Sequence, residues 1–283
     1  MINILFITHS FNKKGGIERV INLKTDVLSN KYKCNLLLLY NLGVIAYNLK
    51  SNIKIFYLNK KIKRVRESFL CNILKMRSII KENSIDIMII EGRGVNFIPL
   101  LLKLFFDIKI IFCDHGSLDG YSSTKLTFKQ NFCNFLDYFF IKNLADKIVT
   151  LTESEKYNYI NKIGVKNEKI TNIYNIIDDD LFKNISDYDC NSKKIITVSR
   201  LDFAKGLEYL IEVAKLVFAK HPDWQWDIYG DGDGDKKYKN KIINLIEQND
   251  LQNHVILQGN RSDIYDLYQN YSIYVMTDRK SVV

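Results

Sequence analysis

Short apolar runs alternate with segments of helical periodicity along almost the whole chain. The apolar runs predict strands at 2–7, 34–40, 53–57, 86–90, 109–113, 147–151, 170–174, 195–198, 225–229, 255–258 and 272–276. The segments between them predict helices at 15–29, 61–82, 94–106, 124–144, 153–162, 206–220, 236–248 and 261–269. Alternation of this kind predicts an α/β protein with doubly wound parallel sheets and crossover helices.

The polar stretch 178–194 predicts a hinge between two such units. A chain of 283 residues, 47% of them hydrophobic, is long enough for two domains with separate cores. Two prolines and thirteen glycines argue against long linkers or disorder. We therefore expect a Rossmann-like domain at 1–185 and a partial one at 190–277, because the second unit stops after its fourth strand.

The net charge of +9 predicts a surface that attracts anions such as nucleic acid, acidic lipid or a phosphorylated substrate. Lys and Arg are spread through both halves without a recognisable nucleic-acid module, so we expect no nucleic-acid partner. One cluster opens the predicted helix 61–82, whose other face is apolar. It fits a helix that lies on anionic lipid, or a core-facing helix with a solvated basic face. The cluster comprises Lys60, Lys61, Lys63, Arg64 and Arg66.

Several features predict a cytoplasmic protein. Five dispersed cysteines without a Cys-x-x-Cys pair indicate reduced thiols, with no disulfide frame or zinc site. The N-terminus has no basic segment or cleavage site, so we expect no signal peptide. The most apolar region, 97–112, is interrupted by Lys103, Asp107 and Lys109 and is too short and charged to span a bilayer.

The run 196–206 carries the strongest candidate for chemistry. An apolar strand ends in Ser199 and Arg200, a short loop follows, and Lys205 and Gly206 open an amphipathic helix. Two cations, loop N–H groups and a positive helix N-terminus would meet at one point, which predicts a pyrophosphate site. Arg200 and Lys205 could also be ordinary solvated charges, but their placement between strand and helix favours phosphate binding.

Two other strand ends carry weaker candidates, since ligands of open α/β sheets bind beyond the carboxyl ends of the strands. Gly15 and Gly16 follow the first strand just ahead of a helix, and either admit a ligand close to the backbone or form a tight turn. His115 follows the strand 109–113 and either meets a ligand or is a satisfied loop histidine.

The stretch 230–235, Gly-Asp-Gly-Asp-Gly-Asp, also follows a strand. It fails as an EF-hand calcium loop, because Lys236 and Ile242 stand where Gly and Glu are needed. An Asp-x-Asp metal–nucleotide site is conceivable here. We favour a flexible strand-to-helix turn at the edge of the cleft, with Gly230 at its start.

These features together resemble the family 4 glycosyltransferases, retaining enzymes with two facing Rossmann-like domains, the GT-B fold. The resemblance covers nearly the whole chain, and the strand–Ser-Arg-Leu-(x)3-Lys-Gly–helix pattern is its most specific part. Its marks are Gly15-Gly-Ile-Glu-Arg-Val20, Asp114-His115-Gly116, Leu151-Thr-Glu-Ser154, Tyr174-Asn-Ile-Ile-Asp178, Val198-Ser-Arg-Leu-Asp-Phe-Ala-Lys-Gly206 and Tyr229-Gly-Asp-Gly232.

The resemblance implies a role for each candidate. Arg200 and Lys205 would hold the diphosphate of a UDP- or GDP-sugar, and His115 would contact the transferred sugar or the acceptor. The implied donor and phosphate site comprises Gly15, Gly16, Ser199, Arg200, Lys205, Gly206 and Gly230. Because protein cations would stabilise the leaving diphosphate, and the departing phosphate would act as base, we expect neither a metal nor a cofactor nor a carboxylate pair.

The resemblance also implies partners and a setting. The first domain would bind a glycan or undecaprenyl-linked acceptor and the second the nucleotide-sugar donor, in envelope polysaccharide or lipopolysaccharide biosynthesis. The basic helix would suit peripheral contact with the cytoplasmic face of the inner membrane. Two alternatives remain open: a sugar-nucleotide epimerase of the same fold, whose cleft carboxylates we cannot locate, and a non-catalytic module that binds phosphoanions or a membrane surface.

The chain departs from the family at two places. Ile176 and Ile177 stand where the family often has proline after the hinge asparagine, a minor difference. After residue 277 the family continues towards a Glu-x7-Glu segment that binds the donor, whereas this chain ends in 278–283. Those six residues fit the codons GAT CGG AAG AGC GTC GTG of a common sequencing adapter, so we expect a non-native tail, a longer natural protein and negligible activity of this 283-residue chain.

Overall fold

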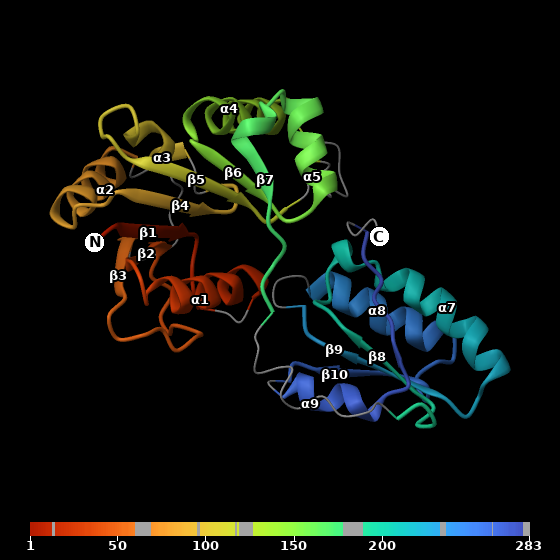
Figure 1. Ribbon diagram of the computed structural model, residues 1–283. Helices are drawn as coiled ribbons and strands as arrows, with labels where there is room; N and C mark the ends of the chain where they lie inside the picture. Colours follow the sequence, from red (N-terminus) through yellow and green to blue (C-terminus); the bar gives the residue numbers. More distant parts are fainter. Residues whose placement is uncertain are drawn as a thin grey trace. The chain divides into compact units, whose positions relative to one another are not determined.

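The computed structural model describes residues 1–12, 15–59, 69–94, 97–116, 118, 127–177, 189–232, 236–261 and 263–279. The chain divides into two compact units, the first reaching to Ile177 and the second formed by nearly all that follows (Figure 1). The basic cluster at 60–66, the boundary predicted at residue 185 and most of the predicted hinge lie outside the described residues.

Unit 1 is built on a seven-stranded parallel sheet in the order β3-β2-β1-β4-β5-β6-β7. Its strands are β1 (Asn3–Thr8), β2 (Lys33–Tyr40), β3 (Lys54–Asn59), β4 (Ile87–Glu91), β5 (Lys109–Asp114), β6 (Lys147–Thr150) and β7 (Ile170–Asn172). Its helices are α1 (Gly16–Leu28), α2 (Phe69–Glu82), α3 (Phe97–Leu102), α4 (Phe128–Leu144) and α5 (Glu153–Asn158), with η2 (Tyr159–Ile163) and η3 (Asn167–Lys169).

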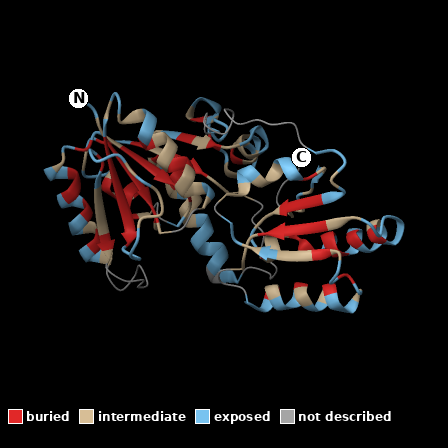
Figure 2. Ribbon diagram, turned by 90° about the horizontal axis from the view of Figure 1, so that it is seen from below, coloured by how far each residue is buried: buried red, intermediate tan, exposed pale blue. Residues whose placement is uncertain are grey.

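Both faces of this sheet are covered, which explains why its strands read as continuous apolar runs. Leu5 and Ile7 of β1 belong to the core on the side of α2, α3 and α4. Ile4 and Phe6 belong to the core on the opposite side, with Ile21 of α1. Figure 1 shows α1 below the sheet and α3 and α4 above it, and Figure 2 shows the buried residues in red along the strands.

Unit 2 contains a smaller parallel sheet in the order β10-β9-β8-β11. Its strands are β8 (Lys194–Val198), β9 (Gln225–Tyr229), β10 (Val255–Gly259) and β11 (Ile273–Tyr274). Its helices are η4 (Phe203–Lys205), α7 (Leu207–Lys220), α8 (Lys236–Gln248), α9 (Ile264–Leu267) and η5 (Tyr268–Asn270). Trp226 and Ile228 pack under α7 and α8, whereas Tyr229 and Tyr271 face α9.

Both sheets have a point where the strand order reverses. In unit 1 the chain proceeds outward from β1 to β2 and β3, and then returns to the other side of β1 with β4. In unit 2 the same reversal separates β8 from β11. Open α/β sheets bind ligands in crevices at the carboxyl ends of the strands on either side of such a reversal. The loops after β1, β4, β8 and β11 are therefore the candidate ligand-binding loops.

The predicted α/β class and the parallel direction of both sheets are confirmed, and each predicted strand is present. Three lengths were wrong. The helix predicted at 94–106 is the short α3, because Leu104 and Phe105 donate to carbonyls three residues back and end it in turns. The strand predicted at 272–276 is regular over two residues, and the helix predicted at 261–269 begins at Ile264 and ends in the 3-10 turn η5. Within the described ranges, each helix is too short or too polar to cross a membrane.

Candidate functional site

The strand-order reversal in unit 2 brings two hydroxyl side chains together. Ile196 of β8 lies opposite Tyr274 of β11, and continuing this parallel register places Ser199 opposite Thr277, just beyond both strands. The side-chain oxygens of Ser199 and Thr277 are both buried, and neither has a hydrogen-bond partner among the described residues. Buried hydroxyls without partners are unusual and costly. The carboxyl end of this sheet therefore holds two buried hydroxyls without a hydrogen-bond partner among the described residues.

Gly230 fixes the loop that carries Ser199. Its φ of +129° is a backbone conformation that glycine alone adopts readily, and a Cβ here would lie 1.9 Å from the Ser199 carbonyl oxygen. The close approach allows the Ser199 N–H to donate to the Tyr229 carbonyl at 2.9 Å and the Leu201 N–H to donate to Asp231 at 3.2 Å. Gly230 thus shapes the loop after β8.

The two predicted phosphate cations both lie in this loop, and each has a carboxylate partner. Arg200 has a side chain that is 75% exposed, and it pairs with Asp202 at 3.0 Å. Lys205 is mostly buried, and its Nζ lies 2.5 Å from Asp278. An exposed pair such as Arg200–Asp202 contributes at most about 1 kcal/mol, so a stronger anion can readily replace the carboxylate.

The N-terminus of α7 is less open than the sequence predicted. Gly206 precedes it in the left-handed region, with φ +60°. The N–H of Leu207, the first residue of α7, donates to the Tyr238 hydroxyl at 3.0 Å. Glu208 also occupies the first turn. Burial would raise its pKa, but hydrogen bonds from Lys241 and Tyr238 lower it, so a negative charge stands where an anion was expected. The candidates that remain for binding a phosphate are the groups of the loop 199–206.

In unit 1 the glycine pair opens α1. Gly15 is the N-cap residue and has an extended backbone, without a side-chain cap. A Cβ at Gly16 would meet no atom within 4 Å, so the first turn of α1 has open space beside it. That space is compatible with a ligand that approaches the backbone there, one of the two alternatives predicted for this glycine pair.

His115 follows β5 and is hydrogen-bonded on one side. Its Nε2 lies 2.6 Å from Oε2 of Glu91, the last residue of β4, whose side chain is fully buried. The same carboxylate accepts from Nζ of Lys24 on α1 at 2.9 and 3.1 Å. Sequence reasoning missed Glu91 and Lys24, although a glutamate that ends the apolar run 87–90 was a signal that could have been read.

The Glu91 carboxylate is ionised. Burial would raise its pKa, but the hydrogen bond from His115 and the charge of Lys24 outweigh burial and lower it. The neighbouring Cys113 is different, because burial and the negative charge of Glu91 raise the pKa of its thiol to about 12. Near neutral pH the cluster therefore contains one carboxylate, one ammonium and one neutral thiol.

A second set of contacts fixes the backbone around His115. Asp114 is buried and accepts from the Tyr159 hydroxyl at 2.6 Å and from the Gly116 N–H at 2.9 Å. Arg93 lies 3.5 Å from Asp114 and donates to the Tyr138 hydroxyl at 2.5 Å. A Cβ at Gly116 would lie 2.6 Å from the Arg93 guanidinium. Sequence reasoning also missed Arg93, which stands between two glycines directly after a strand.

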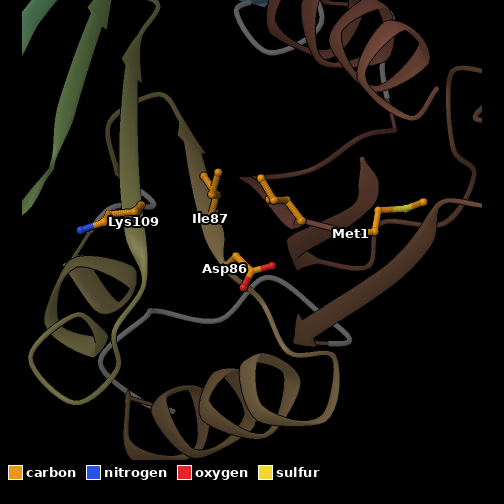
Figure 3. Close-up of a pocket in the computed structure, with 5 residues that line it drawn as sticks. Met1, Asp86, Ile87 and Lys109 are labelled. Atoms are coloured by element: carbon orange, nitrogen blue, oxygen red, sulfur yellow. The ribbon is translucent and has the colours of Figure 1, made fainter. Parts of the chain in front are cut away.

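A surface hollow in unit 1 lies at the opposite end of the sheet, where the strands begin. It is lined by Met1, Ile2, Asp86, Ile87 and Lys109, at the amino ends of β1, β4 and β5 (Figure 3). The Asp86 carboxylate there accepts from the Asn3 N–H at 2.8 Å. The hollow is therefore separate from the carboxyl-end site of Glu91 and His115. In the described part of the chain, no three His, Cys, Asp or Glu side chains are grouped as metal ligands.

Two protein-family models match the chain. A family model of Glycosyltransferase Family 4 matches residues 40–181, and a model of Glycosyl transferases group 1 matches residues 178–280. The amylovoran biosynthesis glycosyltransferase AmsD of Erwinia amylovora is 23% identical over 287 residues, which cover 99% of this chain and 75% of that protein.

A second relative comes from Campylobacter jejuni, and its name describes an N-acetylgalactosaminyltransferase acting on a diphospho-undecaprenol-linked sugar. It is 25% identical over 258 residues, covering 87% of this chain and 66% of that protein. Among solved structures, Anabaena HepE in complex with UDP and glucose matches with a TM-score of 0.75 and 17% identity, covering 98% of this chain and 74% of that one. At this identity the structural match shows the fold, and the chain spans about two thirds to three quarters of the length of these proteins.

Proposed function

The chain belongs to glycosyltransferase family 4, and we propose that it moves a sugar from a UDP- or GDP-sugar to a glycan or undecaprenyl-linked acceptor with retention of anomeric configuration. Unit 1 would bind the acceptor and unit 2 the donor. The observation that carries the proposal is the strand-order reversal of unit 2, where Ser199, Arg200 and Lys205 follow β8 and Thr277 follows β11. The hydroxyls of Ser199 and Thr277 have no hydrogen-bond partner among the described residues.

The proposed chemistry follows from charge. When the bond between sugar and diphosphate breaks, negative charge grows on the leaving phosphate and the sugar becomes oxocarbenium-like. Arg200 and Lys205 stabilise that growing charge, and the hydroxyls of Ser199 and Thr277 donate hydrogen bonds to phosphate or sugar oxygens. The leaving phosphate accepts the proton of the incoming hydroxyl. Because two cations serve the diphosphate, the proposal includes neither a metal nor a cofactor.

Nucleotide binding to the purified chain tests the donor site. Calorimetric titration with UDP and with GDP should give binding that Arg200→Ala and Lys205→Ala each weaken at least about tenfold, because each removes a charge-assisted contact. Lys220→Ala, at the exposed far end of α7, is the matched control and should bind like the wild type. EDTA should leave binding unchanged. Equal affinity in all three variants would contradict the proposed site.

The pair Lys205–Asp278 supports a further proposal, that this chain has negligible activity. The Asp278 carboxylate competes with a phosphate for Lys205. Asp278→Asn should therefore tighten UDP or GDP binding by about three- to tenfold. Sugar transfer is then assayed with a lipid-linked acceptor, and NMR of the product gives its anomeric configuration. Interconversion of the donor without acceptor would favour an epimerase instead.

We also propose peripheral contact with the cytoplasmic face of an anionic membrane. Helix α4 supports it with one outward stripe of aromatic rings: Phe128 is 89% exposed, Phe132 53%, Phe135 62% and Phe139 51%. At 100° per residue these four lie within about 60° of one another, and Asp137, the acidic residue of the helix, lies on the opposite side. With a net charge of +9, anionic lipid is a better partner for this stripe than a second copy of the chain.

Vesicle cosedimentation tests the membrane proposal. The chain should bind phosphatidylglycerol vesicles in preference to phosphatidylcholine vesicles, and Phe132→Ser with Phe135→Ser should reduce binding at least about fivefold. Tyr209→Ser, which removes an exposed ring on α7 of unit 2, is the control. Loss of a dimer in light scattering, with vesicle binding intact, would show that the stripe is instead an interface between two copies.

A further inference from the structure

Three charged or polar side chains form a buried line across unit 1. Lys24 comes from α1, Glu91 from the end of β4 and His115 from the loop after β5. Lys24 donates to both carboxylate oxygens of Glu91, and His115 Nε2 lies 2.6 Å from Oε2. The line begins on the helix opened by Gly16 and ends at a histidine just past a strand. It therefore links helix α1 to the carboxyl end of β4 and to the loop after β5.

The carboxylate determines which nitrogen of His115 carries the hydrogen. An ionised carboxylate only accepts hydrogen bonds, so Nε2 must be the donor. In that tautomer Nδ1 holds the lone pair, and among the described residues His115 makes no side-chain hydrogen bond other than the one to Glu91. The side chain is only 5% exposed, so the ring is held rigidly while Nδ1 has its hydrogen-bonding capacity unused.

The charges around the ring are balanced. The negative charge of the Glu91 carboxylate is paired with the positive charge of the Lys24 ammonium on the same two oxygens. Cys113 lies 3.8 Å from Lys24 Nζ and is a neutral thiol, so it adds no charge. Asp114 is next in sequence to His115, but its carboxylate is engaged by Tyr159, Arg93 and the Gly116 N–H.

We propose that Glu91 is a positioning residue, with Lys24 as its counter-charge, and that together they hold His115 with its Nε2–H directed at the carboxylate, so that Nδ1 accepts a hydrogen bond from a hydroxyl of the bound sugar. The sugar ligand rests on the proposed function. The fixed tautomer and the charge balance do not, since they follow from Lys24, Glu91 and Cys113 in the protein without ligand. A purely structural tie between α1 and β4 would not control the state of the histidine.

Histidine NMR on the ligand-free protein separates these two roles. Long-range ¹H–¹⁵N spectra report both the tautomer and the fraction of imidazolium, and His115→Gln assigns the signal among the four histidines. The wild type should show the tautomer protonated at Nε2. Glu91→Gln should give a mixture of tautomers and less imidazolium at a fixed pH near 6, because Lys24 is left uncompensated. Lys24→Met should do the opposite and give more imidazolium, because Glu91 is left uncompensated.

The decisive result is that the fraction of imidazolium changes in opposite directions in the two variants. A loss of packing would change that fraction in the same direction in both. Glu82→Gln, at the exposed end of α2, is the control and should leave the His115 signal unchanged. An unchanged His115 state in both variants, or a change of the same sign in both, would overturn the proposal. If Glu91→Gln does not fold, Glu91→Asp gives the same readout, because its shorter carboxylate lengthens the contact and should also produce mixed tautomers.

Ligand binding provides a second measurement, which depends on the proposed function. Glu91→Gln should weaken binding of a UDP- or GDP-sugar, or of a sugar acceptor, about three- to tenfold, the effect of one lost hydrogen bond. It should leave the affinity for UDP or GDP alone unchanged, since Nδ1 is proposed to contact the sugar. If the His115 signal changes as expected but Glu91→Gln binds the sugar ligand like the wild type, the positioning role stands and the sugar contact is refuted. Loss of nucleotide affinity as well would contradict the assignment of His115 to the sugar.

Discussion

At the scale of single residues, Glu91 makes the stability of unit 1 depend on pH. Its pKa is lowered in the folded chain, from a model-compound value of 4.5, because His115 and Lys24 outweigh the effect of burial. A carboxylate with a lowered folded pKa stabilises the fold above its unfolded pKa, and that stability is lost as the pH falls through the folded value. We therefore expect unit 1 to lose stability progressively below pH 4.5.

Urea unfolding followed by circular dichroism at pH 7 and pH 4 measures this effect. Glu91→Gln should be less stable than the wild type by about 1–3 kcal/mol at pH 7, because Lys24 loses its partner. The variant should then lose less additional stability on acidification than the wild type does. Glu82→Gln, on the exposed end of α2, should follow the wild type at both pH values. A Glu91→Gln curve parallel to that of the wild type would disprove the link.

The five cysteines should fall into two classes of reactivity. Cys71, Cys133 and Cys190 are exposed, whereas Cys34 and Cys113 are buried. Burial raises the pKa of both buried thiols, that of Cys113 to about 12, so neither forms the reactive thiolate near neutral pH. Iodoacetamide at pH 8 should label the three exposed cysteines in the native protein and all five in urea, as read by mass spectrometry. Native labelling of Cys113 at the rate of Cys71 would contradict the buried cluster.

Candidate residues next to strand ends could be predicted from the sequence, but their partners could not. Ser199, Arg200 and Lys205 were found because an apolar strand, a loop and a helix follow one another locally. Glu91 depends on Lys24, which is 67 positions away, and on His115, which is 24 positions away. Only the strand order β1-β4-β5 brings these three together, and the pattern of apolar runs does not specify that order.

At the scale of elements, two glycines that follow strands have opposite surroundings, so we expect opposite effects when each is replaced by alanine. A Cβ at Gly230 would lie 1.9 Å from a backbone carbonyl at φ +129°, whereas a Cβ at Gly16 would meet nothing within 4 Å. Gly230→Ala should destabilise unit 2 by about 2 kcal/mol or more, from strain and steric overlap. Gly16→Ala should be neutral or stabilising by up to about 1 kcal/mol, because alanine favours the first turn of α1. Urea unfolding of each variant tests the pair, and a destabilisation of similar size in both would refute it.

Helices and strands could be told apart in the sequence because their hydrophobic periodicities differ. The residues at which each element begins and ends were harder to predict. The apolar runs gave the strands because helices cover both faces of the sheet in unit 1. The N-terminus of α7 is the instructive failure. Its position was predicted correctly, but Tyr238, from the next helix, donates to Glu208 and accepts from the Leu207 N–H. Such tertiary capping leaves no local trace in the sequence.

At the scale of the whole molecule, two separate cores allow each unit to be followed on its own. Both tryptophans, Trp224 and Trp226, belong to unit 2, and Trp226 is buried with its Nε1–H donating to Thr197 at 3.0 Å. The buried thiols Cys34 and Cys113 belong to the core of unit 1. Tryptophan fluorescence therefore reports the unfolding of unit 2, and the appearance of these thiols reports the unfolding of unit 1.

These two probes locate the donor site without any assay of turnover. A ligand that binds only the folded form raises stability by about 2.7 kcal/mol at 100 times its Kd. For a unit of about 100 residues this raises the unfolding temperature by roughly 10 °C. UDP or GDP should therefore raise the midpoint seen by tryptophan fluorescence and leave the midpoint seen by thiol exposure nearly unchanged. The double variant Arg200→Ala/Lys205→Ala should abolish the shift. A nucleotide-induced rise in the thiol midpoint alone would place the nucleotide in unit 1 and reverse the assignment of donor and acceptor.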